Sequence, residues 1–168
     1  MSYAEALEQF QKALELDHNV ARTYYSLGLV YEATGTTEEA EANFQQALRL
    51  NPESAVTNYN LGDLFLTEKK YPQANLFLAQ AIKLDPEDAE FHFKLGQLYS
   101  LQKRYDVAAD ELQKAVQLRP EFGEAHYLLG RCYAALDRPE LADAEYAKSR
   151  VLRSANAHQT DAASKSPR

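Results

Sequence analysis

A period of 34 residues runs through this chain. Leucine, glycine and then an aromatic residue three positions later recur at that interval, with glycine at Gly28, Gly62, Gly96 and Gly130. No insertion or deletion interrupts the spacing. Self-similarity at a fixed period of this length is the signature of a repeat architecture, in which each unit buries its apolar face against its neighbours. We therefore expect a row of similar structural units.

Each unit carries helical periodicity twice. From Tyr24 to Tyr31 and again from Ala40 to Ala47, the apolar residues recur at the i, i+3 or i+4, and i+7 positions that place them on one helix face. Between these stripes, Gly35 and Thr36 are expected to end the first helix and cap the second. Proline after the second stripe, as at Pro52, ends that helix. The sequence thus predicts an all-α fold with two helices per repeat.

The small residues at fixed positions suggest how the helices pack. Each repeated glycine lies on the apolar stripe, where the missing side chain lets another helix approach closely. Ser54 and Asp88 stand where a side-chain cap is expected, and Pro72 and Pro139 stand where a first helical turn tolerates proline.

These positions resemble the tetratricopeptide repeat. The resemblance rests on a Leu-Gly pair, an aromatic residue, Ala, a large residue, Ala and Pro, which in the first full repeat are Leu27, Gly28, Tyr31, Ala40, Phe44, Ala47 and Pro52. It implies an α-solenoid of stacked antiparallel helix pairs, a right-handed superhelix whose first helices line the concave face. Two departures occur in the last repeat, where Ser149 replaces alanine and Ser154 replaces proline.

The resemblance also sets expected boundaries. An array is expected over 1–153 and a disordered tail over 154–168. The array would comprise a half repeat, 1–20, and full repeats at 21–54, 55–88, 89–122 and 123–156. The half repeat contains a second helix whose first helix is absent, so its open apolar end is a candidate surface for self-association.

Charge and composition exclude several classes of function. Lys and Arg number 18 against 25 Asp and Glu, a formal charge of -7, which argues against nucleic acid as the main partner. The single Cys132 excludes an internal disulfide, and the scattered histidines do not form a metal framework. The start of the chain lacks the features of a signal peptide, and no segment is apolar enough for membrane insertion. We expect a cytoplasmic protein.

A second stripe on the first helices is the candidate binding surface. Its residues lie about a third of a turn from the core stripe, and one aromatic ring recurs per repeat. The candidate residues of the concave groove are Arg22, Tyr25, Leu29, Tyr59, Asp63, Leu66, Glu90, Phe93, Gln97, Glu124, Tyr127 and Arg131. Aromatic rings among polar groups are typical of interaction hot spots, although rings on adjacent helices can equally stack and stiffen the array. Both interpretations remain open.

The charge of this stripe suggests the class of partner. Acidic residues outnumber basic ones, which favours a peptide that carries apolar anchors and basic side chains. Asp63 and Glu90 would repel a terminal carboxylate, so the carboxylate-clamp type of tetratricopeptide repeat is not expected.

Catalytic and metal chemistry find no support in the sequence. His92 and His126 share one repeat position that faces the helix pair, so we interpret them as core histidines. Cys132 has no positioned base and is interpreted as a buried or half-buried thiol. No cofactor or metal is expected. The prediction is a non-catalytic scaffold or adaptor that binds a peptide or helix; the alternatives are a substrate-recruiting region of a larger enzyme, such as a glycosyltransferase, and a self-associating assembly element.

Overall fold

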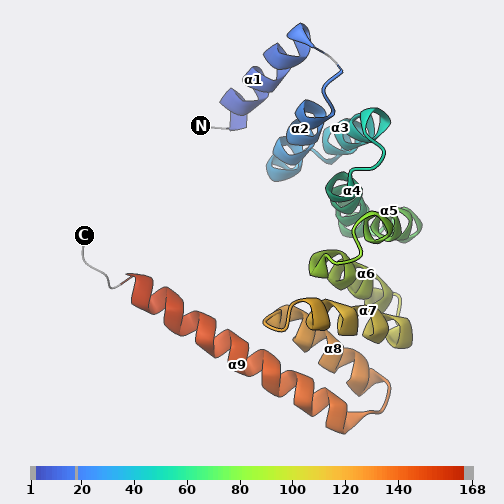
Figure 1. Ribbon diagram of the computed structural model, residues 1–168, viewed down its shortest axis with the longest axis vertical. Helices are drawn as coiled ribbons and strands as arrows, with labels where there is room; N and C mark the ends of the chain where they lie inside the picture. Colours follow the sequence, from blue (N-terminus) through green and yellow to red (C-terminus); the bar gives the residue numbers. More distant parts are fainter. Residues whose placement is uncertain (1–2, 18, 165–168) are drawn as a thin grey trace. The chain divides into compact units, whose positions relative to one another are not determined.

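The computed structural model describes residues 3–17 and 19–164, and within them the regular structure is entirely helical (Figure 1). This confirms the all-α prediction. The helices of these residues are α1 (Tyr3–Leu16), α2 (Ala21–Thr34), α3 (Thr37–Leu50), α4 (Ala55–Thr67), α5 (Tyr71–Leu84), α6 (Ala89–Leu101), α7 (Tyr105–Leu118), α8 (Gly123–Ala135) and α9 (Pro139–Ser164).

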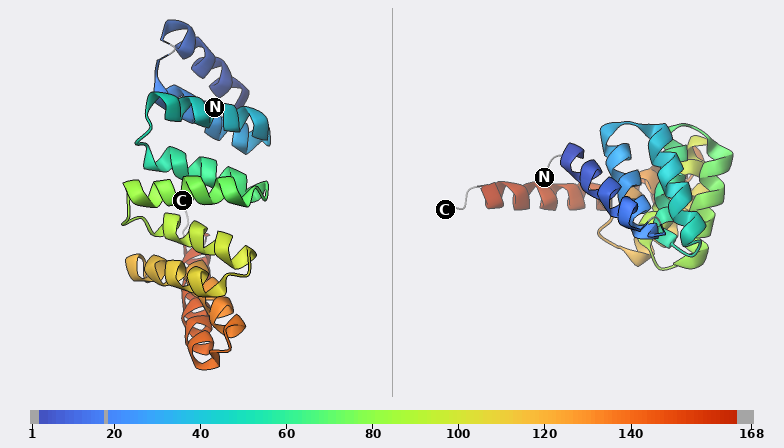
Figure 2. Two further views of the ribbon diagram at one scale, coloured as in Figure 1. Left: turned by 90° about the vertical axis from the view of Figure 1, so that its right-hand side faces the viewer. Right: turned by 90° about the horizontal axis from the view of Figure 1, so that it is seen from above.

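The chain divides into two compact units, Met1–Pro86 and Glu87–Arg168. In the first unit, α2 pairs with α3 and α4 with α5, while α1 packs on α2 and α3 on α4. In the second unit, α6 pairs with α7 and α8 with α9, while α7 packs on α8. The helices of each pair run antiparallel, as the two further views show (Figure 2). Sequential antiparallel pairing is the arrangement that the repeat predicts.

The turn inside each pair has the same hydrogen-bonded form in every full repeat. Gly35, with φ of 78°, takes the left-handed conformation that ends α2. The amide of Thr36 then donates to the carbonyl oxygen of Tyr31 at 2.9 Å, which closes the helix end. Lys69, Lys103 and Asp137 occupy the equivalent positions and also have positive φ.

The predicted caps are confirmed at two sites and wrong at a third. The Ser54 hydroxyl accepts from the amide of Thr57, and the Asp88 carboxylate accepts from the amide of Glu90 at 2.7 Å. Thr36 makes no cap bond to α3, because its hydroxyl instead donates to the carbonyl oxygen of Tyr31 at 3.1 Å. Pro72 lies in the first turn of α5, as expected.

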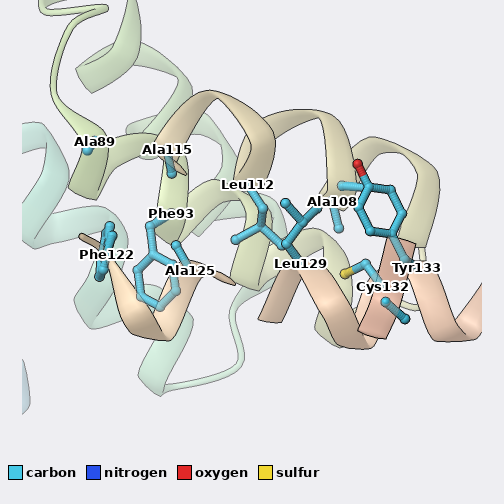
Figure 3. Packing of buried hydrophobic residues seen from close by; sticks show 12 residues of the cluster. Ala89, Phe93, Ala108, Leu112, Ala115, Phe122, Ala125, Leu129, Cys132 and Tyr133 are labelled. Carbon is cyan, nitrogen blue, oxygen red and sulfur yellow. The ribbon is translucent and has the colours of Figure 1, made fainter. Parts of the chain in front are cut away.

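The repeated glycines allow close helix contact, as the sequence predicts. A Cβ added to Gly62 would lie 2.8 Å from Cγ of Leu78, and one added to Gly96 would lie 2.6 Å from Cγ of Leu112. Both leucines are completely buried. In the second unit, Leu112 packs among the buried side chains of α7 and α8 (Figure 3). Small residues thus face large ones within each helix pair.

The expected tail over 154–168 overlaps the end of α9. Helix α9 continues to Ser164, because neither glycine nor proline interrupts the sequence between Glu140 and that residue. Residues 165–168 lie outside the described part of the chain. Across the described residues, no helix combines the length and apolar character needed to cross a membrane.

Candidate functional site

The second unit carries a groove of about 770 Å³ between the first helices of its two repeats. Residues of α6, the turn between α7 and α8, α8 itself and the middle of α9 line it. We call it the α6–α8 groove. The lining includes every candidate residue that the sequence placed in this unit, namely Glu90, Phe93, Gln97, Glu124, Tyr127 and Arg131.

The floor of the groove is a pair of aromatic rings. The ring of Phe93 lies 4.7 Å from that of Phe122, centroid to centroid, and both belong to the core of the unit (Figure 3). Only 8% of Phe93 is exposed. Phe122 stands at the repeat position where Ser54 and Asp88 cap a helix, but its side chain gives no cap to α8. Phe93 therefore serves the packed interior more than the open surface.

One wall of the groove is an ion pair stacked on this floor. Nη2 of Arg119 donates to Oε1 of Glu90 at 2.7 Å, and the guanidinium lies 3.5 Å from the centroid of the Phe122 ring. Arg119 thereby holds α6 against the turn that precedes α8. The charge of Glu90 is balanced within the protein.

Tyr127 is the most open ring in the groove. It is 49% exposed, and its ring meets that of Tyr146 at 5.8 Å between centroids. Leu128 and Leu152, both half-buried, add apolar surface nearby. An exposed ring beside part-buried leucines can hold an apolar side chain of a partner.

The charge of the α6–α8 groove differs from the expected acidic surface. Its lining contains equal numbers of carboxylates and guanidiniums, namely Glu90, Glu121, Glu124, Arg119, Arg131 and Arg153. Arg119 and Arg153 were not among the candidate residues, because these were drawn only from the first helix of each repeat. Arg119 directly precedes the repeat proline, and Arg153 directly precedes the serine that replaces it. This shared repeat position is the sequence feature from which they could have been predicted.

The candidate residues of the first unit are less open. The hydroxyl of Tyr25 accepts a hydrogen bond of 3.0 Å from Nδ2 of Asn60, which ties α2 to α4. Arg22 and Tyr25 line a smaller cavity of about 230 Å³. Leu66 is 6% exposed and is buried in α4 to about the same extent as Phe93 in α6. Leu29 is exposed, whereas Tyr59 and Asp63 are half-buried.

The two core histidines each bind a glutamate of the second helix in their own repeat. Nδ1 of His92 lies 2.7 Å from Oε2 of Glu111, and Nδ1 of His126 contacts Oε2 of Glu145 in the same way. Both rings are buried, which confirms the sequence interpretation. Nε2 of His126 also lies 2.9 Å from the carbonyl oxygen of Pro120.

Lysines complete both histidine–glutamate pairs. Lys114 donates to Glu111 at 2.9 Å and Lys148 donates to Glu145 at 2.7 Å. Burial by itself raises the pKa of each glutamate, but the hydrogen bonds from lysine and histidine outweigh it and lower the pKa below its ordinary value. Both carboxylates are therefore ionised at neutral pH.

Cys132 is fully buried in the core of the second unit, as the sequence interpretation allowed. Burial is the main reason that the pKa of its thiol is raised above the ordinary value, which makes the thiol less reactive. Within the described residues, no cluster of three His, Cys, Asp or Glu side chains could hold a metal ion.

Comparisons with known proteins agree with this geometry. Sequence models of the tetratricopeptide repeat match residues 1–53, 59–121 and 99–150. Among solved structures, MamA superposes with a TM-score of 0.86 at 24% identity, covering 93% of this chain and 91% of that one. MamA 41-end from Desulfovibrio magneticus RS-1 gives a TM-score of 0.84 at 26% identity and covers 92% and 87%.

A further solved structure is YrrB, described as a TPR protein with an unusual peptide-binding site. Its TM-score is 0.77 at 29% identity, with 89% of this chain and 77% of that chain covered. A search of curated protein sequences gave no match. The repeated helix pairs, the family matches along residues 1–150 and these structural similarities lead to one conclusion: the chain belongs to the tetratricopeptide repeat family.

Proposed function

We propose that this protein is a non-catalytic scaffold that binds a peptide or a helix of a partner protein on the first helices of its repeats. Tetratricopeptide repeat proteins generally bind other proteins, and the similar structure of YrrB is described as having a peptide-binding site. The observation that carries the proposal is the α6–α8 groove, in which the half-exposed ring of Tyr127 lies open to a ligand.

Tyr127 is the proposed anchor of the site. Truncation of hot-spot aromatics in interfaces costs most where neighbouring contacts exclude water. Leu128 and Leu152 supply such contacts beside Tyr127, and Gln97 and Arg131 offer polar groups at the same groove. The residues Arg22, Tyr25, Leu29, Tyr59 and Asp63 are proposed as the corresponding surface of the first unit.

The charges of the groove shape the proposed ligand. Because the charge of Glu90 is balanced by Arg119, a basic ligand gains little from that carboxylate. Glu124, which is exposed at the start of α8, can meet a basic group of the ligand, and Arg131 can meet an acidic one. We therefore propose that an apolar side chain against Tyr127 determines affinity, and that charge determines the orientation of the peptide.

An immobilised peptide array, followed by titration of the peptides that bind, tests the proposal. Tyr127→Ala should weaken binding by about 2 kcal/mol, or roughly thirtyfold. Leu101→Ala is the matched control, because Leu101 is an exposed apolar residue of the same unit that does not line the groove.

Circular dichroism melts must show that both variants remain folded. If the folded Tyr127→Ala protein binds the same peptides with unchanged affinity, the groove is not the binding site. If the Leu101→Ala protein loses binding equally, the interaction surface lies elsewhere on the unit.

A further inference from the structure

His126 joins two acceptors that belong to different parts of the second unit. Its Nε2 atom faces the carbonyl oxygen of Pro120, in the turn before α8, and its Nδ1 atom faces the carboxylate of Glu145, on α9. His126 itself is only 4% exposed, and together with Pro120 and Glu145 it lines a cavity of about 660 Å³.

Only the doubly protonated ring satisfies both partners. A peptide carbonyl has no hydrogen to donate, so Nε2 must carry one to bond with Pro120. The Glu145 carboxylate is ionised, since its pKa is lowered, and so Nδ1 must carry a hydrogen as well. A neutral imidazole carries one hydrogen and has to give up one of these bonds.

The Pro120 bond lies next to the lining of the α6–α8 groove. Pro120 lies in the turn from Arg119 to Phe122, and the amide of Phe122 donates to the carbonyl oxygen of Arg119 at 3.0 Å. Arg119 is the wall of the groove and Phe122 is part of its floor. His126 therefore connects the groove lining to α9 through a group that can lose its proton.

We propose that protonation of His126 controls the α6–α8 groove: the imidazolium holds the turn 119–122 in its binding form, and loss of one proton releases it. The effect on ligand affinity rests on the proposed function, whereas the effect on the turn does not. Partner binding in this groove is then stronger while the ring carries both protons than after it has lost one.

The other groups around His126 do not account for a change between about pH 5.5 and 8. On α9 these are Glu145, which stays ionised, and Lys148, which is bonded to it. Tyr133 of α8 keeps its proton, because burial above all raises its pKa. From α7, Gln113 and Gln117 carry no charge. Arg119 is stacked on Phe122 and paired with Glu90.

The chain itself supplies the test substitution. Asn58 occupies the same repeat position as His126, and its Nδ2 donates to the carbonyl oxygens of Ser54 at 2.9 Å and Pro52 at 3.5 Å. Pro52 is the repeat equivalent of Pro120. His126→Asn therefore keeps a donor near the turn but cannot titrate.

Two NMR measurements on the whole chain, between about pH 5.5 and 8, test the proposal without any ligand. The imidazole nitrogen shifts report whether His126 carries two protons. Amide hydrogen exchange at Phe122 and Gly123, corrected for the intrinsic pH dependence, reports opening of the turn. We expect protection in the wild type to fall by about three- to tenfold as the ring loses its second proton, which is the worth of one hydrogen bond.

The His126→Asn protein should show the same protection at every pH in this range. His92→Asn is the control from the neighbouring repeat and should leave the pH dependence at Phe122 and Gly123 as in the wild type. Glu145→Gln should move the transition of the turn to lower pH, because a neutral amide stabilises the imidazolium less than a carboxylate does.

A neutral His126 ring throughout this range would overturn the proposal. Equal pH profiles for the wild type and His126→Asn would also overturn it, and so would an unchanged transition in Glu145→Gln if the asparagine variant does not fold. Failure of the peptide array would count against the proposed function alone, since neither NMR measurement involves a peptide.

Discussion

Ser149 of α9 donates a hydrogen bond of 2.8 Å from its hydroxyl to the carbonyl oxygen of Gly123, the first residue of α8. The equivalent residues of the other full repeats are Ala47, Ala81 and Ala115. With 2% of its surface exposed, Ser149 is as buried as those alanines. The serine that breaks the repeat pattern therefore adds a bond between the helices of the last pair.

Replacing this serine with the repeat alanine should weaken the last pair. Alanine fits the position, so the cost of Ser149→Ala is the lost hydrogen bond, about 1 kcal/mol in the free energy of unfolding. Urea denaturation measures it. Ser154→Ala, on the exposed side of the same helix, is the control and should change the value by less than about 0.5 kcal/mol. Equal effects at both serines would contradict the prediction.

One substitution should have opposite effects at two glycines of the second unit. Gly96→Ala should destabilise the protein by about 1 to 3 kcal/mol, because the new Cβ would lie 2.6 Å from the buried Leu112. Gly123→Ala should stabilise it by about 0.5 to 1 kcal/mol, since its Cβ would meet Leu152 at an ordinary 3.5 Å and the unfolded chain loses freedom. Thermal and urea unfolding check the signs; two changes of the same sign would refute the packing argument.

Replacing the left-handed turn residues with glycine should stabilise the protein to different extents. Lys103 has φ of 60° and Asp137 has φ of 57°, at the position where the first full repeat has Gly35. Lys103→Gly should raise the free energy of unfolding by about 1 kcal/mol, because a lysine is strained in this conformation. Asp137→Gly should gain less, since aspartate adopts it more readily. A loss of stability in Lys103→Gly would show that its side chain contributes more than the strain costs.

The second unit should lose stability in acid through Glu111 and Glu145. The pKa of each carboxyl group is lowered in the folded protein, so their contribution is fully present above the ordinary value of 4.5 and is lost as pH falls through the folded-state value. Glu145→Gln should make unfolding less dependent on pH below about 4.5. Urea titrations between about pH 3 and 7 measure this. An unaltered pH slope in the variant would exclude Glu145 as a contributor.

Much of the fold could be predicted because the residues that pack against each other recur at fixed positions of the repeat. Gly62 and Leu78 recur at fixed positions, and those positions are where a helix pair meets most closely. The helix ends could be predicted because two residues act locally: Gly35 adopts the left-handed conformation easily, and Pro52 restricts the backbone of the residue before it. Thr36 was misjudged because a threonine hydroxyl has two possible partners, and the sequence cannot choose between the helix before it and the helix after it.

The candidate site was harder to predict because repeat position does not fix exposure. Phe93 and Tyr127 occupy the same position, yet one is buried and the other is half-exposed. The difference comes from Phe122, which replaces a capping residue and covers Phe93 with its own ring. Arg119 then stacks on that ring and bonds Glu90. Such contacts depend on residues from α6 and from the turn before α8 together, which a stripe along one helix does not report.

The buried Cys132 is a natural probe of local opening in the second unit. The sequence has a single cysteine, and its thiol lies in the core of the second unit with its pKa raised by burial. A thiol reagent can reach it only when α8 separates from its neighbours. The rate of labelling at low denaturant therefore reports the opening of that unit separately from unfolding of the whole chain, with no engineered label.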